Sequence, residues 1–327
     1  MSTLDLIRQP IAADLEAFDK FVADEFRSDN NLVGNMLRDA MSSRGKAIRP
    51  IIVMLSAALN SSAGIVTRRA WIAAMMVEMI HVASLIHDDV IDDADTRRGK
   101  PSMNALWQSK RAVLTGDYIL ARNINIALSS GQYDLTTHIF KAIAILCEGE
   151  IIQDDCARRL AMTREEYLQI IGKKTASLIS ISASAGAMAA GASAEKVENM
   201  RRFGEAIGMA FQIQDDILDY SRTAQTGKPT NNDLREGKIT LPLLVILEQS
   251  DEEQRAEILR LLGECHQNEE SLEKLHSLVE EQGGVEFASQ VMGAYIAKAT
   301  EILAQYPESV FRTAMMNLCA FITERNV

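Results

Sequence analysis

The stretch HVASLIHDDVIDDADTRRGK, from His81 to Lys100, ends an apolar helical run in a cluster of carboxylates. Residues four apart on a helix share a face, so Asp88 and Asp92 are expected side by side. Asp89 and Asp93 fall about a quarter-turn round the helix. Like charges stacked in this way destabilise a bare helix, and a hard cation such as Mg²⁺, which prefers oxygen ligands, would relieve the repulsion. The stretch therefore predicts a divalent metal site.

Two arginines, Arg97 and Arg98, follow these carboxylates directly. The planar guanidinium group presents forked donors that match the oxygens of a phosphate group. Carboxylates, a metal ion and adjacent arginines together predict that the chain binds a phosphorylated substrate.

A second acidic cluster lies in FQIQDDILDY, from Phe211 to Tyr220. Asp215, Asp216 and Asp219 repeat the spacing of the first cluster, and Gln212 precedes Asp215 by three residues on the same helical face. Two such clusters can face each other across a helical bundle. They would then hold several divalent ions around one diphosphate, whose negative charge the metals neutralise as it leaves.

Composition indicates a helical, well-packed protein. The 327 residues are 47% hydrophobic but only 5% aromatic, with 15 Met and 6 Pro. The net charge of -11 argues against binding nucleic acid or anionic membrane surfaces through bulk electrostatics.

Neither a signal peptide nor a membrane span is predicted. The N-terminus lacks a basic start followed by an apolar core. The segment from Thr175 to Ala194 is uncharged, but its Ser, Ala and Gly content is typical of a tightly packed helix and not of a lipid-facing one. A cytoplasmic protein without a transmembrane segment is expected.

Helical periodicity covers most of the chain, and strand-like alternation is not found. We expect a single all-α domain over residues 1–327, built around buried central helices. The central helix is almost uncharged apart from Glu78, which we expect to be hydrogen-bonded. The predicted helices are residues 3–30, 32–42, 51–60, 67–90, 103–108, 111–130, 134–156, 163–171, 174–190, 194–220, 239–249, 251–264, 269–281, 283–305 and 308–325.

The sequence resembles the trans-isoprenyl diphosphate synthases, whose hallmark is two DDxxD motifs. Further motifs of that family follow in the same order over residues 45–243. They are GKAIRP (Gly45 to Pro50), IHDDVIDDADTRRGKPS, GD at Gly116 and Asp117, GE at Gly149 and Glu150, KTA at Lys174 to Ala176, FQIQDDILDY, GK at Gly227 and Lys228, and DLREGKITLPL (Asp233 to Leu243). The resemblance implies an isoprenoid-synthase-type helical bundle with a central active-site cavity, assembled as a homodimer.

The resemblance also implies which residues bind the two substrates. The diphosphate of isopentenyl diphosphate, the extender, would be bound by Lys46, Arg49, His81 and Arg98. The allylic diphosphate would be held by Arg97, Lys174 and Lys238, with Lys228 nearby.

For the metals, the resemblance implies three Mg²⁺ ions in each active site. Asp88 and Asp92 would ligate two of them and Asp215 the third, with Asp89, Asp216 and Asp219 as further ligands or outer-shell partners. Thr175 and Gln212, beside Lys174, would stabilise the allylic cation through their dipoles. The departing diphosphate would then accept the proton that is lost.

Two positions depart from the family pattern. Ala47 replaces a common arginine in GKAIRP, which removes one positive charge near the extender. Asn231 replaces a glycine that is usual among longer-chain members. Asn tolerates the left-handed backbone better than other non-glycine residues, so the loop geometry can survive.

Product length should depend on the side chains before Asp88. In the family that the sequence resembles, aromatic residues at the positions of Ala83 and Ser84 stop the growth of the prenyl chain at short products. Both residues are small here. A deeper floor would come from Ile80 or beyond, with each helical turn adding roughly 5.4 Å. We therefore predict an all-trans product longer than farnesyl, of the long-chain kind used for quinone side chains, with geranylgeranyl diphosphate as the alternative.

Two other functions use similar features. A class I terpene cyclase also ionises an allylic diphosphate, but it needs no extender site, which Lys46, Arg49 and Arg98 would form here. A non-catalytic regulatory subunit tends to lose one aspartate motif, whereas this sequence has both.

Overall fold

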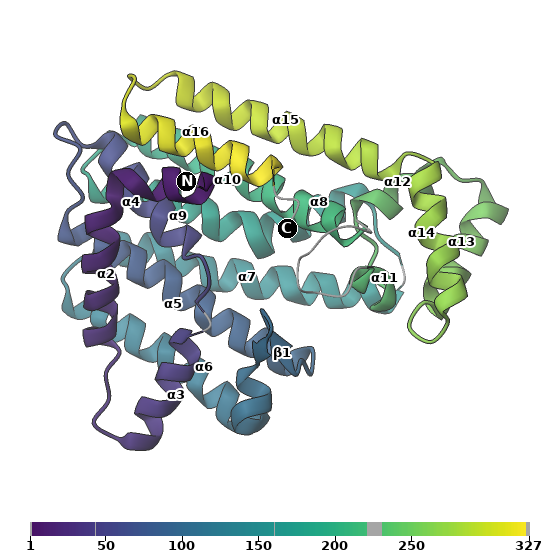
Figure 1. Ribbon diagram of the computed structural model, residues 1–327, viewed down its shortest axis with the longest axis horizontal. Helices are drawn as coiled ribbons and strands as arrows, with labels where there is room; N and C mark the ends of the chain where they lie inside the picture. Colours follow the sequence, from purple (N-terminus) through teal and green to yellow (C-terminus); the bar gives the residue numbers. More distant parts are fainter. Residues whose placement is uncertain (1, 43, 160, 221–230, 325–327) are drawn as a thin grey trace. The chain divides into compact units, whose positions relative to one another are not determined.

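The computed structural model describes residues 2–42, 44–159, 161–220 and 231–324 (Figure 1). The chain is all-α, as predicted, apart from one pair of two-residue strands. Its elements are α1 Thr3–Arg8, η1 Gln9–Ile11, α2 Ala12–Glu25, α3 Asn31–Ser42, α4 Ile48–Asn60, α5 Arg68–Ile91, β1 Thr96–Arg97, β2 Lys100–Pro101, α6 Met103–Ser129, α7 Tyr133–Arg159, α8 Arg164–Ile171, η2 Gly172–Ala176, α9 Ser177–Ala189, α10 Ala194–Asp219, α11 Asn232–Arg235, α12 Leu241–Gln249, α13 Glu252–Glu264, α14 Glu269–Glu281, α15 Gly284–Ala304 and α16 Val310–Thr323.

The chain divides into two compact units, each built from three stretches. The first unit comprises Met1–Ile143, Ile179–Arg202 and Leu303–Leu318; the second comprises Ala144–Leu178, Phe203–Ile302 and Cys319–Val327. The first aspartate cluster therefore belongs to the first unit and the second cluster to the second unit. A single domain over the whole chain stays a prediction.

The centre of the first unit is α5. Its side chains from Ala70 to Ala83 are almost all buried, because the helix is apolar on every face. By length and composition α5 could cross a membrane, but 72% of its most apolar window is buried inside the protein, as in the core helix of a soluble protein. Figure 1 shows α6 alongside α5, and α6 packs on it through small buried residues such as Ala112 and Gly116.

Small side chains allow α9 to pack closely on α4 in the same unit. A Cβ atom on Gly186 would lie 2.2 Å from the carbonyl oxygen of Val53, so only glycine permits this approach. The Ser56 hydroxyl donates a hydrogen bond of 2.6 Å to the Ala183 carbonyl across the same contact. The uncharged Ser, Ala and Gly segment is thus a tightly packed helix, as predicted.

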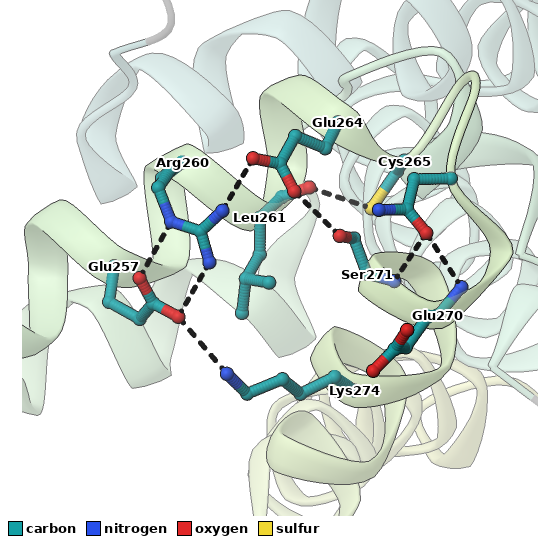
Figure 2. Close-up of polar contacts among 9 residues, drawn as sticks. Glu257, Arg260, Leu261, Glu264, Cys265, Glu270, Ser271 and Lys274 are labelled. Atoms are coloured by element: carbon teal, nitrogen blue, oxygen red, sulfur yellow. Dashed lines mark hydrogen bonds and ion pairs between the residues drawn. The ribbon is translucent and has the colours of Figure 1, made fainter.

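The second unit has its own apolar core, to which α12 contributes a run of buried residues from Leu241 to Leu247. Helices α13 and α14 pack together on this core and are joined by polar contacts at their surface (Figure 2). Arg260 donates to Glu257 at 2.8 Å, and Lys274 of α14 lies 3.1 Å from the same carboxylate. These donors lower the pKa of Glu257 to about 2. The contacts fix how the two amphipathic helices meet.

The structure differs from the predicted secondary structure at three places. The N-terminal helix is interrupted at Gln9–Ile11, where Pro10 cannot donate an N–H. The two helices predicted at 103–108 and 111–130 form one element with a non-helical kink at Gln108. The absence of strands was wrong for residues 96–101, where β1 and β2 pair antiparallel.

Candidate functional site

The first aspartate cluster lies at the C-terminal end of α5. The helix ends at Ile91, Asp92 is its C-cap, and Asp93 has a left-handed backbone with φ 47°. The N–H of Asp92 donates to the Asp88 carbonyl at 2.8 Å, so the two residues are one helical turn apart, as predicted. The negative end of the helix dipole disfavours carboxylates at this position. Nearby cations are therefore needed to stabilise the cluster.

One such cation is Arg97. Its Nε atom lies 2.6 Å from the Asp89 carboxylate, which is only 3% exposed. Burial raises the pKa of Asp89, and the arginine opposes that shift. Asp89 is thus buried against Arg97, whereas Asp88 and Asp92 are more open to solvent.

The β1–β2 hairpin separates the two arginines. Its turn residues, Arg98 and Gly99, both have positive φ, which is typical of a tight two-residue turn. The Arg98 guanidinium lies against Gly45 of the GKAIRP motif, where an added Cβ would come within 2.0 Å of Nη1. Gly45 therefore permits this close approach of Arg98, while Arg97 pairs with Asp89.

Three of the residues assigned to the extender interact electrostatically beside α5. Burial and the charges of Arg49 and Arg98 lower the pKa of His81 well below its usual value, so His81 is neutral at pH 7. Burial also lowers the pKa of Arg49 to about 10, which leaves it charged. The fourth residue, Lys46, has an exposed side chain, and its carbonyl accepts a hydrogen bond of 2.7 Å from Arg8. The first unit thus contains a basic group suited to an anion.

The GD motif of α6 supports the same helix end. A Cβ atom on Gly116 would lie 2.3 Å from Nε2 of His87, so glycine makes room for the imidazole. The Asp117 carboxylate is 3.5 Å from the same nitrogen. His87 is therefore held between α5 and α6 immediately before Asp88.

In the second unit, four polar side chains form a hydrogen-bonded chain. The Thr175 hydroxyl donates to Gln212 Oε1 at 2.7 Å, and Gln212 Nε2 donates to Asp216 Oδ1 at 2.9 Å. The Tyr167 hydroxyl donates to Asp216 Oδ2 at 2.6 Å. Asp216 accepts both hydrogen bonds through its carboxylate oxygens, so it fixes which way the Gln212 amide points. Burial raises the pKa of Asp216 well above its usual value, while both donors oppose that shift.

Lys174 and Thr175 lie in a π-helical turn, Gly172–Ala176, of a kind often found at functional sites. Glycines allow two neighbouring helices to approach it. A Cβ on Gly149 of α7 would lie 3.0 Å from the Lys173 side chain, and one on Gly208 of α10 would lie 2.5 Å from Ala176 Cα. The GE motif also supplies Glu150, whose carboxylate is 2.8 Å from Lys174 Nζ.

Asp219 ends α10 and caps the next helix. Its two carboxylate oxygens accept the backbone N–H groups of Asn232 and Asp233 at 3.0 and 2.9 Å. Asn231 adopts the left-handed backbone with φ 60°, the conformation that asparagine was expected to tolerate. Lys238 pairs with Glu236 after α11, and Lys228 lies outside the described residues.

A pocket of about 160 Å³ lies beside these groups. Lys174, Thr175, Gln212 and Asp216 line one part of it together with Tyr167. Asp233, Lys238 and the backbone around Gly237 line another part. The second unit therefore places cations, an oriented amide and carboxylates around one concave, partly apolar space.

The residues assigned to product length differ in burial. Ala83 and Ile80 are buried at 0% and 2% exposure, whereas Ser84 is partly open and donates its hydroxyl to the His81 carbonyl at 2.9 Å. Position 84 can thus accept a larger side chain more easily than position 83.

The donors at both clusters fit Mg²⁺ in kind. They are carboxylate oxygens, and Mg²⁺ usually takes one or two of these from the protein while phosphate oxygens and water complete its shell. Among the described residues, no group of three or more His, Cys, Asp or Glu side chains is close enough to hold a metal. The metal roles of Asp88, Asp92 and Asp215 stay predictions.

Two residues were missed or misjudged from the sequence. Tyr167 lies 48 residues before Asp215, and no spacing rule connects its hydroxyl with Asp216. Glu78 was expected to be hydrogen-bonded, but within the described part of the chain neither of its carboxylate oxygens has a hydrogen-bond partner. The sequence showed only a charged residue within an apolar helix. The role of this residue depends on the arginines that the fold brings near it.

Comparison with known proteins agrees with this description. Residues 30–279 match the polyprenyl synthetase family. The chain is 34% identical over 320 residues to an all-trans-nonaprenyl-diphosphate synthase (geranyl-diphosphate specific) of Rhodobacter capsulatus, covering 98% of this chain and 97% of that protein.

Two solved structures share the fold. One is a decaprenyl diphosphate synthase from Rhodobacter capsulatus, with a TM-score of 0.92 and 32% identity, covering 98% of this chain and 99% of the other. The second is a polyprenyl synthase from Caulobacter crescentus, complexed with calcium and isoprenyl diphosphate, with a TM-score of 0.90 and 30% identity over 99% and 98% of the two chains. The match over most of the chain, together with the paired aspartate clusters, shows that the protein belongs to the polyprenyl synthetase family.

Proposed function

We propose that the protein is a Mg²⁺-dependent prenyltransferase that condenses isopentenyl diphosphate with an allylic diphosphate. The product is an all-trans polyprenyl diphosphate longer than farnesyl, of the long-chain kind used for quinone side chains. Two aspartate clusters of identical spacing, each at a helix C-terminus and each with basic side chains in the same unit, support this proposal most directly.

The extender is bound in the first unit. Arg49 and Arg98 bind its diphosphate with Lys46, through guanidinium and ammonium donors that suit phosphate oxygens. His81 is neutral because of its burial beside these arginines, so it offers a single N–H donor without adding charge. Ala47 removes one cation of the family pattern, but the three charged donors remain.

The allylic diphosphate is bound by Arg97, Lys174 and Lys238, with Lys228 added from outside the described residues. Three Mg²⁺ ions, held by Asp88, Asp92 and Asp215 with Asp219 nearby, would neutralise the charge of the leaving diphosphate. Thr175 and Gln212 direct their oxygen dipoles toward the allylic cation. Tyr167 and Asp216 hold the Gln212 amide in that orientation. No side chain of the pattern is a strong base, so the departing diphosphate accepts the proton.

Rival functions make different demands on these residues. A terpene cyclase would leave Arg49 and Arg98 without a substrate, and a regulatory subunit would not need both aspartate clusters. A cytoplasmic location is part of the proposal and is supported by the burial of α5 inside the protein.

The proposal includes a homodimer formed through α6. An apolar stripe runs along the exposed face of this helix, opposite the face packed on α5, with Leu114 55%, Ile124 40% and Leu128 48% exposed. Leu114, Ala121 and Leu128 are spaced by seven residues, which keeps them in one line on a helix. The same patch on a second copy would cover it about a two-fold axis, as in most homodimers.

The first prediction concerns product length. The purified chain, incubated with isopentenyl diphosphate and geranyl or farnesyl diphosphate, is expected to give products longer than farnesyl, sized by chromatography after removal of the diphosphate. Ser84→Phe should shorten the product, because the ring would block the channel one turn below Asp88, whereas Ser84→Ala should not. A wild-type product no longer than farnesyl, or a hydrocarbon formed from farnesyl diphosphate alone, contradicts the proposal.

The second prediction concerns the metals. Asp88→Ala and Asp215→Ala should each lower kcat by about 100-fold or more, because each removes a carboxylate that holds Mg²⁺. Asp95→Ala, a change at an exposed residue of the same loop, is the matched control and should retain activity. Far-ultraviolet circular dichroism should show all three variants folded. Near-normal turnover of either variant at saturating Mg²⁺ would refute the metal roles.

The third prediction concerns Tyr167. Tyr167→Phe removes one donor from Asp216 and loosens the Gln212 amide, so kcat should fall about tenfold, the effect of losing a hydrogen bond to a charged group. Tyr295→Phe makes the same change at a tyrosine of the second unit outside this hydrogen-bonded chain and should leave kcat unchanged. Equal kcat values in wild type and Tyr167→Phe would show that the hydroxyl has no positioning role.

The fourth prediction concerns the dimer. Light scattering should give twice the chain mass of 36.1 kDa for the wild type. Leu114→Glu combined with Leu128→Glu should give the monomer mass, because the charges would be buried in the contact. Leu32→Glu, at a leucine of α3 that is 47% exposed, is the control. A monomeric wild type, or a double variant that stays dimeric, rules out α6 as the contact between copies.

A further inference from the structure

Glu78 is a buried charge in the middle of the central helix. It is 1% exposed, among the buried apolar side chains of α5. Neither of its carboxylate oxygens has a hydrogen-bond partner among the residues that the structure describes. A buried carboxylate without donors is costly unless other charges compensate it. What surrounds Glu78 should therefore explain why it is there.

Three arginines of the first unit act on it electrostatically. Arg44 Nε lies 3.8 Å from Glu78 Oε1. Burial raises the pKa of Glu78, and the charges of Arg44, Arg49 and Arg98 oppose that shift. The Nε atoms of Arg44 and Arg49 are buried, and no described residue forms a hydrogen bond with either of them. One carboxylate thus faces three cations that repel one another. This arrangement leaves a surplus of positive charge suited to a further anion.

Arg44 ties this cluster to the N-terminal helix. Its Nη2 atom is 3.0 Å from Asp19 Oδ1, and its guanidinium lies 5.7 Å from the centre of the Phe18 ring. Arg44 immediately precedes Gly45, against which Arg98 lies. A line of alternating charge therefore runs from Asp19 through Arg44 to Glu78 and on to Arg49 and Arg98.

We infer that Glu78, held by Arg44 and Asp19, is a positioning residue for the extender's diphosphate. The inference depends on the proposed function, in which Arg49 and Arg98 bind isopentenyl diphosphate. While no substrate is bound, Glu78 is the anion that keeps the two guanidinium groups close together. Without it, the long arginine side chains would separate toward solvent, as such side chains readily do. Binding would then have to reassemble the site, which weakens affinity.

Positioning and net charge predict opposite results when Glu78 is neutralised. Removing a negative charge beside an anion site strengthens the attraction for an anion by Coulomb's law. Losing the positioning of Arg49 and Arg98 weakens binding instead. The direction of the change in KM for isopentenyl diphosphate therefore distinguishes the two effects.

The test is steady-state kinetics of Glu78→Gln, which keeps the side-chain volume and removes the charge. KM for isopentenyl diphosphate should rise about tenfold, equivalent to 1.4 kcal/mol. KM for the allylic diphosphate should change less than twofold. Glu78→Asp keeps the charge and should raise the extender's KM less than Glu78→Gln does. A merely structural role would not affect one substrate selectively.

Two further variants keep the test decisive. Arg44→Gln leaves Glu78, Arg49 and Arg98 in place, so it should raise the same KM, and it decides the question if Glu78→Gln does not fold. Ser56→Ala removes a buried hydrogen bond of the same unit and should lower thermal stability without changing either KM.

Several results would overturn the inference. They are an unchanged or lowered KM for isopentenyl diphosphate in Glu78→Gln, or a parallel rise of both KM values. Arg49→Gln separates this failure from failure of the proposed function. If Arg49→Gln raises the extender's KM while Glu78→Gln does not, only the inference is wrong. If Arg49→Gln also leaves that KM unchanged, the proposed extender site is wrong as well.

Discussion

Both aspartate clusters lie where the helix dipole opposes them, at the C-terminal ends of α5 and α10. Carboxylates in this position stay ionised only if cations or hydrogen-bond donors compensate them. In the first unit that compensation comes from Arg97 against Asp89. In the second it comes from Tyr167 and Gln212 at Asp216, and from backbone N–H groups at Asp219. Asp88 and Asp92 are more exposed than Asp89.

This compensation requires close backbone approach, which explains several glycines of the motifs. Gly116 makes room for His87, Gly45 for Arg98, and Gly149 and Gly208 for the π-helical turn that presents Lys174 and Thr175. Motifs that the sequence suggests for phosphate or metal binding thus also contain glycines that allow neighbouring helices and loops to pack closely. An added Cβ would clash with its neighbour at Gly45, Gly116 and Gly208, and would crowd Lys173 at Gly149.

The first unit shows the reverse arrangement, in which several cations act on a single buried carboxylate. Arg44, Arg49 and Arg98 form a cationic group around one buried carboxylate, Glu78. Such a group is stable only with an anion among the cations. It is ready to accept a diphosphate if the arginines are already close together. In the second unit, Asp216 and Asp219 instead accept hydrogen bonds from neutral donors, which are Tyr167, Gln212 and two backbone N–H groups.

Sequence alone determined the all-α class, most helix boundaries and the family, because helical periodicity and ordered motifs are local properties. It also anticipated the left-handed Asn231, since backbone tolerance belongs to the residue type. The tertiary structure decided what local patterns cannot encode. Packing brings the Tyr167 hydroxyl to Asp216, and the turn of the β1–β2 hairpin separates Arg98 from Arg97. It also buries Glu78 near Arg44 without a hydrogen-bond partner among the described residues. Each of these depends on groups far apart in the chain, whose distances are set by packing and not by spacing.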